Sequence, residues 1–287
     1  MTASLTRNDL PGHTYRMRSA LGLLKACHPE PTAAVTAVAA LLALATGRGA
    51  VGAATVAAAV LASQLAVGWS NDALDAARDA AVGRTDKPIV AGTVSRRTVA
   101  TAAVIAAAAT VPLALLSGVR AGSVAGVGLA AALLYNWPLK ATVVSVLPYT
   151  VSFAALPAFV VLGVASPPWW LVVAGALLGA GAHFANVLPD LDDDARTGVH
   201  GLPHRLGGQV SALLTGGLLV AATGVLAFGP PGPPGWAGAG AFGAATVVLI
   251  GGGYLAARRP ASRVAFRSML VVAVLDVILL LATGLRL

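Results

Sequence analysis

Acidic residues gather in two short segments of this chain, and the first segment is regularly spaced. Asn71, Asp72, Asp75 and Asp79 follow one another at helical intervals, and Asp86 lies a little further along. Residues three and four positions apart share one face of a helix, so these side chains form a single polar stripe. Carboxylates packed this densely repel one another unless a positive charge lies between them.

The second segment repeats the pattern. His183, Asn186, Asp190 and Asp194 are separated by three, four and four residues, which again defines one helix face. Two further aspartates between the last two leave the choice of metal ligands open. Asp190 and Asp194 are favoured because they lie one turn apart. The two segments together hold eight of the eleven acidic residues.

Carboxylate and amide oxygens are hard ligands that suit Mg²⁺, an ion that keeps several waters and bridges to substrate phosphates. Two such segments facing each other could hold a diphosphate through bridging metal ions. The alternative is that the acids only solvate loops, but two clusters with the same pattern argue against it. Nearby cations could neutralise the remaining phosphate charge; they are Arg84, Lys87, Lys140 and Arg205.

The rest of the chain is strongly apolar: 57% of residues are hydrophobic, 10% are charged, and the mean hydropathy is +0.82. Soluble domains carry about 25% charged residues, so this composition excludes a soluble globule and a disordered protein. The single cysteine, Cys27, excludes an intramolecular disulfide. Long Ala- and Leu-rich runs favour membrane helices over the short alternating segments of a β-barrel.

We therefore predict an all-α polytopic membrane protein with about nine transmembrane helices. The breaks fall at Gly-, Pro- and Arg-rich positions. The fourth run is short for a full span, so we expect it to be tilted or partly buried. The expected spans are approximately 20–46, 51–77, 97–117, 122–136, 142–165, 169–188, 207–228, 236–256 and 264–285.

Nine spans also predict the orientation. Sixteen of the nineteen basic residues fall on the side of the N-terminus, and the exceptions are Arg48, Arg120 and Arg286. The positive-inside rule then places residues 1–19, as an N-terminal tail, and both Asp-rich loops in the cytoplasm of a cell-membrane protein. The net charge of +8 reflects this topology and contact with anionic lipid, and not nucleic-acid binding. No protein partner is indicated.

These residues resemble the UbiA superfamily of intramembrane prenyltransferases. The family signature N-D-x-x-D-x-x-x-D is intact from Asn71 to Asp79, and its continuation matches 83–89. The family's Tyr…Lys element is similar to Tyr135 and Lys140. Residues 190–207 resemble the second family signature and the tail that follows it, and Arg205 lies in that tail.

The resemblance covers most of the chain and implies one UbiA-like domain over 1–287. It implies nine helices around a central cavity that is capped by the two Asp-rich loops and open sideways to lipid. It further implies Mg²⁺-dependent ionisation of an isoprenyl diphosphate and capture of the carbocation by a lipophilic acceptor, usually an aromatic ring. Asp72, Asp75, Asp190 and Asp194 would be the catalytic residues. The metal ligands would be these four with Asn71 and Asp79.

The resemblance assigns diphosphate binding to Arg84, Lys87, Tyr135, Lys140 and Arg205. Two positions depart from the family pattern. Gly83 replaces an asparagine, and Lys87 replaces an arginine, which turns a bidentate contact into a point charge.

Several other polar residues have open roles. His183 is a candidate for acceptor or diphosphate binding, or it satisfies a structural hydrogen bond, and Asn186 and Asp193 are candidates for acceptor binding or for supporting the ligands. Asp276 lies mid-span in the last helix, where we expect a buried partner for it.

Three functions compete. The favoured function is prenyl transfer to an acceptor. A terpene cyclase of the same superfamily would use the same metal site. A non-catalytic transporter would leave the two Asp clusters unexplained. Cyclisation favours an aromatic-lined cavity, and the expected liners are few: Phe153, Phe159 and Phe184.

Overall fold

The computed structural model describes residues 12–232, 235–258, 267–268, 271–272 and 274–275. All regular structure in this part of the chain is helical, which confirms the predicted fold class. The helices are α1 (Gly12–Ala26), α2 (Pro29–Ala45), α3 (Gly49–Ala81), α4 (Arg96–Leu115), α5 (Val119–Asn136), α6 (Val146–Leu162), α7 (Trp169–Val187), α8 (Leu191–Arg196), α9 (Leu202–Phe228) and α10 (Trp236–Arg258), with short 3-10 helices η1 (Leu139–Ala141) and η2 (Leu188–Asp190).

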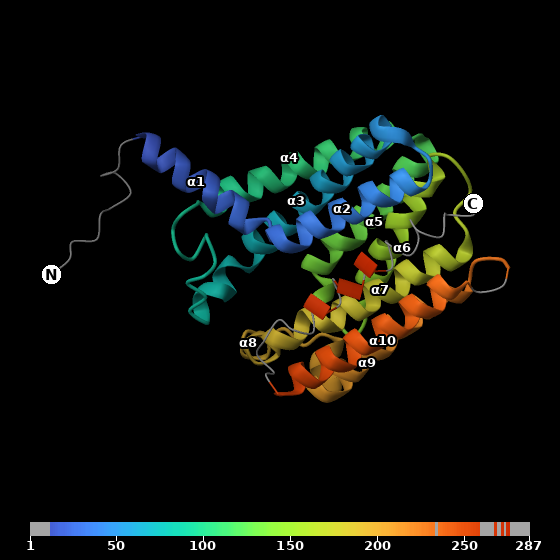
Figure 1. Ribbon diagram of the computed structural model, residues 1–287. Helices are drawn as coiled ribbons and strands as arrows, with labels where there is room; N and C mark the ends of the chain where they lie inside the picture. Colours follow the sequence, from blue (N-terminus) through green and yellow to red (C-terminus); the bar gives the residue numbers. More distant parts are fainter. Residues whose placement is uncertain (1–11, 233–234, 259–266, 269–270, 273, 276–287) are drawn as a thin grey trace.

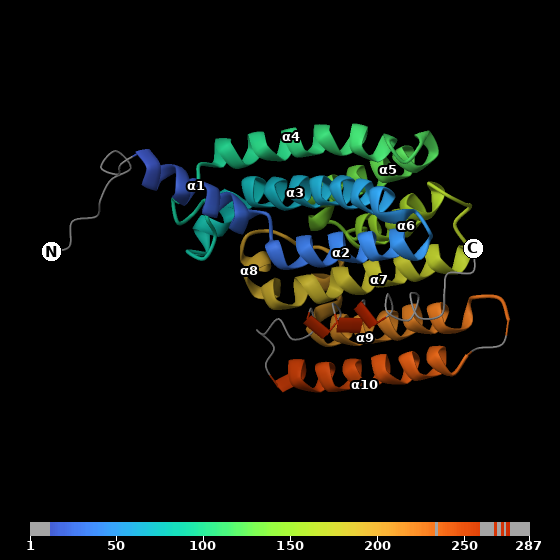
Figure 2. The same cartoon turned by 45° about the horizontal axis from the view of Figure 1, so that its top comes forward.

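The long helices lie alongside one another in a bundle, and α1 projects from it (Figure 1). Helix α3 packs between α2 and α4, while α7 packs against α6 and α9, and α10 contacts α9. The 82–95 loop and α8 gather at one end of the bundle, at the left in Figure 2. We call this the Asp-rich end, because α3 finishes there and both acidic segments belong to it.

Five helices are long and apolar enough to cross a membrane: α3, α4, α5, the 169–196 stretch that contains α7, and α9. A sixth span results if α1 and α2 are counted together, and α6 and 238–252 are shorter apolar helices. The predicted count of nine spans therefore stays a prediction. Its ninth span, 264–285, and Asp276 with it, lies almost wholly outside the described residues.

The predicted first span, 20–46, differs from the structure. It is broken at Cys27 and His28, where α1 and α2 meet at a bend of 65°. His28 adopts a left-handed backbone with φ of 56°, and Pro29 opens the next helix. Proline fits the first turn of a helix because the N–H it lacks has no helical partner there. The structure thus has two helices, α1 and α2, where the apolar pattern predicted a single continuous span.

At the end of the bundle opposite the Asp-rich end, Arg48 connects several helices by hydrogen bonds. Its guanidinium donates hydrogen bonds to the Val160 carbonyl at 3.0 Å and to Ser117 Oγ at 2.8 Å. These bonds join the α2–α3 turn to α6 and to the α4–α5 turn. An arginine so placed satisfies backbone and hydroxyl acceptors at the helix ends, and it closes this end of the bundle.

Candidate active site

Asp72 is the most deeply buried acid of the first segment, with 2% of its surface exposed. Two cationic or proton-bearing groups surround it: Lys87 Nζ lies 2.7 Å and His28 Nε2 lies 3.1 Å from its Oδ1. A buried carboxylate needs such partners, because an uncompensated charge away from water is very costly. Asp72 is thus paired with residues from two other segments, the α1–α2 break and the 82–95 loop.

His28 reaches Asp72 because α3 and the α1–α2 break approach very closely. At Gly68, one turn before Asp72, an added Cβ would lie 2.5 Å from the Cys27 carbonyl oxygen, so only glycine fits. Trp69 Nε1 donates to the Leu23 carbonyl at 2.9 Å and ties α1 to the same stretch of α3. The strained left-handed conformation of His28 is the kind of feature found at functional sites. Sequence reasoning did not single out His28 for this role.

Asp75 forms ion pairs with Lys140 and with Arg78. Lys140 comes from η1, far along the chain, so the structure brings the segment after α5 against the first acidic segment. Burial lowers the pKa of Lys140, and the Asp75 carboxylate opposes that shift. A partly desolvated ammonium of this kind is a strong partner for a phosphate oxygen.

Asn71 connects the acids to the end of α5. Its amide donates to Asp75 Oδ2 at 3.2 Å and to Asn136 Oδ1 at 3.3 Å. Asn136 in turn donates to the Val67 carbonyl at 2.9 Å and to Ser70 Oγ at 2.7 Å. Asn136, which is 3% exposed, was missed from the sequence although it adjoins Tyr135. Its network fixes the orientation of the Asn71 side chain.

Arg84 joins the two acidic segments. Its guanidinium pairs with Asp86 at 3.1 and 3.2 Å, and Nη1 lies 3.2 Å from Asp190 Oδ1. The hydrogen bonds to Asp86 raise the pKa of Arg84 further, and the same contact lowers the pKa of Asp86. Asp79, by contrast, makes no ion pair among the described residues. The two predicted segments therefore do meet at the Asp-rich end.

The ion pairs that Asp193 and Asp194 of the second acidic segment form are longer than those of Asp72. Asp194 lies 3.7 Å from His204 Nε2, and Asp193 pairs with Arg196 at 3.3 Å. Arg205 is exposed and donates from Nε to the carbonyl of His200, just before its own helix α9, at 3.2 Å. Of the predicted phosphate-binding cations, Arg84, Lys87 and Lys140 contact the acids.

His183 is buried, with 1% of its surface exposed, and lies beside the cavity lining without being part of it. Its Nε2 is 3.0 Å from Ser145 Oγ, which also accepts the Leu202 backbone N–H at 2.9 Å. This network joins α7, the start of α6 and the start of α9. Asn186, one turn further along α7, is exposed and lines the cavity.

The donor set fits Mg²⁺, with one qualification about how it is arranged. The predicted ligands are all oxygen donors. Within the described part of the chain, however, no three His, Cys, Asp or Glu side chains converge on one point that could hold a metal ion. Mg²⁺ is usually bound by one or two carboxylates together with substrate phosphates. The site therefore suits an ion that binds with a phosphate, and not a preformed metal cage.

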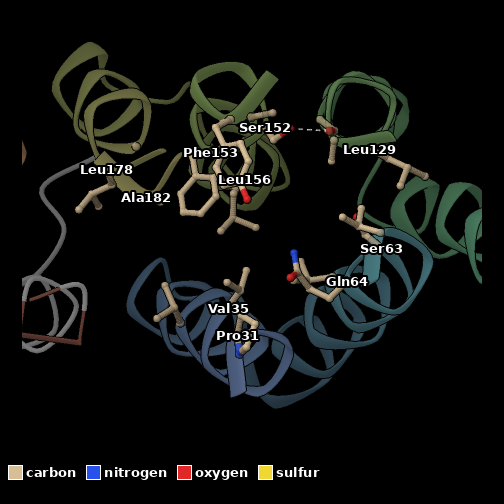
Figure 3. Close-up of a pocket in the computed structure, with 18 of the residues that line it drawn as sticks. Pro31, Val35, Ser63, Gln64, Leu129, Ser152, Phe153, Leu156, Leu178 and Ala182 are labelled. Carbon is tan, nitrogen blue, oxygen red and sulfur yellow. Dashed lines mark hydrogen bonds between the residues drawn. The ribbon is translucent and has the colours of Figure 1, made fainter. Parts of the chain in front are cut away.

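An apolar cavity of about 340 Å³ extends from Asn71 and Tyr135 into the bundle between α2, α3, α5, α6 and α7. Figure 3 shows a section of it in which Val35, Phe153 and Leu156 face the open centre. Of the expected aromatic liners, Phe153 and Phe159 line the cavity. Phe184 is buried against His183, with ring centroids 5.5 Å apart, and is not among the residues that line it.

Comparison with protein families identifies a match to the UbiA prenyltransferase family over residues 33–276. That match covers most of the chain and includes both acidic segments. The chain belongs to the UbiA prenyltransferase family. The predicted resemblance is confirmed, and the chain is a multi-pass membrane protein of a prenyl-transferring family. A comparison with curated proteins returned no match.

Solved UbiA-fold structures superpose on the described bundle. A UbiA homologue from Aeropyrum pernix K1 without ligand shares 23% identity, with a TM-score of 0.69 over 89% of this chain and 98% of that chain. A UbiA homologue from Archaeoglobus fulgidus bound to DMAPP and Mg²⁺ shares 14%, with a TM-score of 0.68 over 92% and 99%. A digeranylgeranylglyceryl phosphate synthase shares 15%, with a TM-score of 0.66 over 94% and 100%. At these identities the likeness establishes a UbiA fold.

Proposed function

We propose that this UbiA protein transfers a prenyl group from an isoprenyl diphosphate to a lipophilic, aromatic acceptor in a Mg²⁺-dependent reaction. The observation that carries the proposal is that both acidic segments, with Arg84, Lys87 and Lys140 among them, meet beside an apolar cavity that Asn71 lines. A charged diphosphate and a hydrocarbon tail need this combination of surroundings. The A. fulgidus homologues bound to Mg²⁺ with DMAPP or GPP support the class of donor.

Asn71, Asp72, Asp75, Asp79, Asp190 and Asp194 would hold Mg²⁺, which neutralises diphosphate charge when it is bound. Three cationic side chains near these carboxylates would bind the diphosphate directly. Arg84, Lys87 and Lys140 each pair with a carboxylate. With the carboxylates bound to Mg²⁺, these side chains would be free to bind phosphate oxygens. Preorganised charges of this kind stabilise a departing anion without reorganisation.

In the reaction the bond between prenyl C1 and the diphosphate oxygen breaks, and its electron pair leaves with the diphosphate. The acceptor forms a new bond to C1 and loses a proton. The rings of Tyr135 and Tyr149, whose centroids are 4.8 Å apart, line the cavity where it meets the acidic segments. Aromatic rings stabilise nearby cations, and a dry lining protects a carbocation from water.

The orientation of the protein belongs to the same proposal: the N-terminus and the Asp-rich end face the cytoplasm of a cell membrane, where soluble diphosphates are available. Labelling tests it. In a Cys27→Ala background, Asp192→Cys should react with a membrane-impermeant maleimide in inside-out vesicles only. Labelling of intact cells would reverse the orientation.

Product analysis separates transfer from cyclisation. Purified protein is incubated with geranyl, farnesyl and geranylgeranyl diphosphate and Mg²⁺, with and without a lipid extract that contains candidate acceptors. Prenyl transfer predicts new prenylated lipids in mass spectra only when the extract is present. A cyclic hydrocarbon or a terpene alcohol in the reaction without extract would overturn transfer and identify a terpene cyclase.

A further inference from the structure

Two of the polar side chains that line the largely apolar cavity lie on α3, well away from the Asp-rich end. Ser63 and Gln64 of α3 line it together with Val35, Phe153 and Leu156 (Figure 3). In Figure 3 the Gln64 amide points into the open centre of the section, opposite α6. Gln64 precedes Asn71 by two helical turns, so it lies about 10 Å further from the Asp-rich end along α3.

The serine and threonine hydroxyls that line the cavity from other helices are already satisfied by backbone carbonyls. Thr32 donates to the Cys27 carbonyl at 2.7 Å, Thr110 to that of Ala106 at 2.9 Å, and Ser152 to that of Gly128 at 2.9 Å. Ser63 and Gln64, in contrast, have no hydrogen-bond partner among the described residues. Glutamine and serine in membrane helices ordinarily find a partner on a neighbouring helix.

Ser63 and Gln64 are half-buried, and polar groups that face an apolar cavity favour a ligand that completes their hydrogen bonds. An amide offers two donors and one acceptor oxygen, and a hydroxyl offers one donor and two lone pairs. Together they match a hydroxyl or carbonyl group and do not match a hydrocarbon tail. The tail instead has the apolar residues further in, including Val60, Phe159 and Leu226.

We propose that Ser63 and Gln64 form a subsite that hydrogen-bonds an oxygen substituent of the acceptor. The inference rests on the proposed prenyl transfer and narrows its substrate class to acceptors with a hydroxyl or carbonyl group. An aromatic acceptor anchored by its oxygen at Gln64 extends its far edge toward the acidic segments. That edge is where prenyl C1 is released, so the subsite sets which ring position is prenylated.

The test compares 1-naphthol with 1-methylnaphthalene, which has a similar shape but no hydroxyl. Binding to the full-length protein in lipid nanodiscs is measured by equilibrium dialysis, with empty nanodiscs as the blank. We expect the wild type to bind 1-naphthol about 5- to 10-fold more tightly than 1-methylnaphthalene, as one or two neutral hydrogen bonds predict. Gln64→Met, which keeps the length of the side chain but removes the amide, should abolish the preference.

Gln209→Met is the matched control, because Gln209 is exposed on α9 and does not line the cavity. It should keep the wild-type preference. Ser63→Ala is a milder second variant and should reduce the preference; thermal unfolding checks that each variant is folded. Equal binding of both probes by the wild type, or a preference that persists in folded Gln64→Met and Ser63→Ala, would overturn the subsite.

This measurement needs neither a prenyl diphosphate nor Mg²⁺. A negative result would therefore leave the proposed prenyl transfer standing. Conversely, a failure to detect prenyl transfer would leave a measured hydroxyl preference intact. A KM for geranyl diphosphate that changes in Gln64→Met, with unchanged naphthol binding, would assign Gln64 to the prenyl tail and also overturn the subsite.

Discussion

Arg84 and Asp190 lie 106 residues apart in the chain, and their side chains form an ion pair with Nη1 3.2 Å from Oδ1. This pair connects the loop after α3 to the short helices that follow α7. Because Arg84 also pairs with Asp86, one guanidinium links both acidic segments at the Asp-rich end. A diphosphate that binds between the segments must meet this side chain.

Replacing Arg84 with Ala should raise the KM for geranyl diphosphate. Hydrogen bonds to charged groups contribute about 1.5–3 kcal/mol, which corresponds to a roughly 10- to 100-fold weaker interaction. Arg84→Lys should recover part of the loss, because a lysine keeps the charge without the forked geometry. Steady-state pyrophosphate release measures the effect. Arg97→Ala, an exposed change on α4, is the control, and an unchanged KM in Arg84→Ala would exclude Arg84 from diphosphate binding.

Gly68→Ala should destabilise the protein and weaken the contact of His28 with Asp72. The new Cβ would lie 2.5 Å from the Cys27 carbonyl oxygen, so the α1–α2 break must shift away from α3. Overpacking of this kind costs about 1–3 kcal/mol, which thermal unfolding in detergent detects.

The matched control for Gly68 is Gly216→Ala on α9, where an added Cβ has no neighbour within 4 Å. Alanine is favoured over glycine inside a helix by about 0.5–1 kcal/mol, so this variant should be as stable as the wild type or slightly more stable. Equal unfolding temperatures for the Gly68 and Gly216 variants would contradict the close approach at Gly68.

Divalent metal should bind well only together with a diphosphate. Among the described residues, no group of three potential ligands is gathered around one point, and the carboxylates pair with Lys87, Lys140 and Arg84 instead. Electron paramagnetic resonance titration with Mn²⁺ should show weak binding to the protein alone and much tighter binding after geranyl diphosphate is added. Tight binding without the diphosphate would point to a preformed metal site. EDTA should abolish turnover and leave the thermal unfolding unchanged.

Hydropathy predicted several helix positions closely. The expected spans 122–136 and 169–188 correspond to α5 (Val119–Asn136) and α7 (Trp169–Val187). Such agreement is expected because a long apolar run fixes both the length and the position of a membrane helix. The break in 20–46 was missed, since an apolar count does not register that Pro29 favours a new helix start over a continuous one.

The acids themselves could be found from spacing, but their partners could not. Helical periodicity places Asn71, Asp72 and Asp75 on one face without any tertiary information. The contact of His28 with Asp72 depends on a left-handed backbone at the helix break and on a glycine crossing, which are properties of the assembled bundle. Asn136 offered a local signal, because an asparagine at the end of an apolar helix needs hydrogen-bond partners. Gln64, a polar residue inside the second predicted span 51–77, offered a similar signal.

The central claim is that the carboxylates of the first acidic segment act on an isoprenyl diphosphate, and Asp72→Asn tests it most directly. The change keeps the shape of a side chain that contacts both Lys87 and His28, but it removes the charge. Pyrophosphate release from geranyl, farnesyl and geranylgeranyl diphosphate should require Mg²⁺ in the wild type and fall by at least about 100-fold in Asp72→Asn. Arg97→Ala, at an exposed position on α4, should retain wild-type turnover. Undiminished release by folded Asp72→Asn protein would contradict the account.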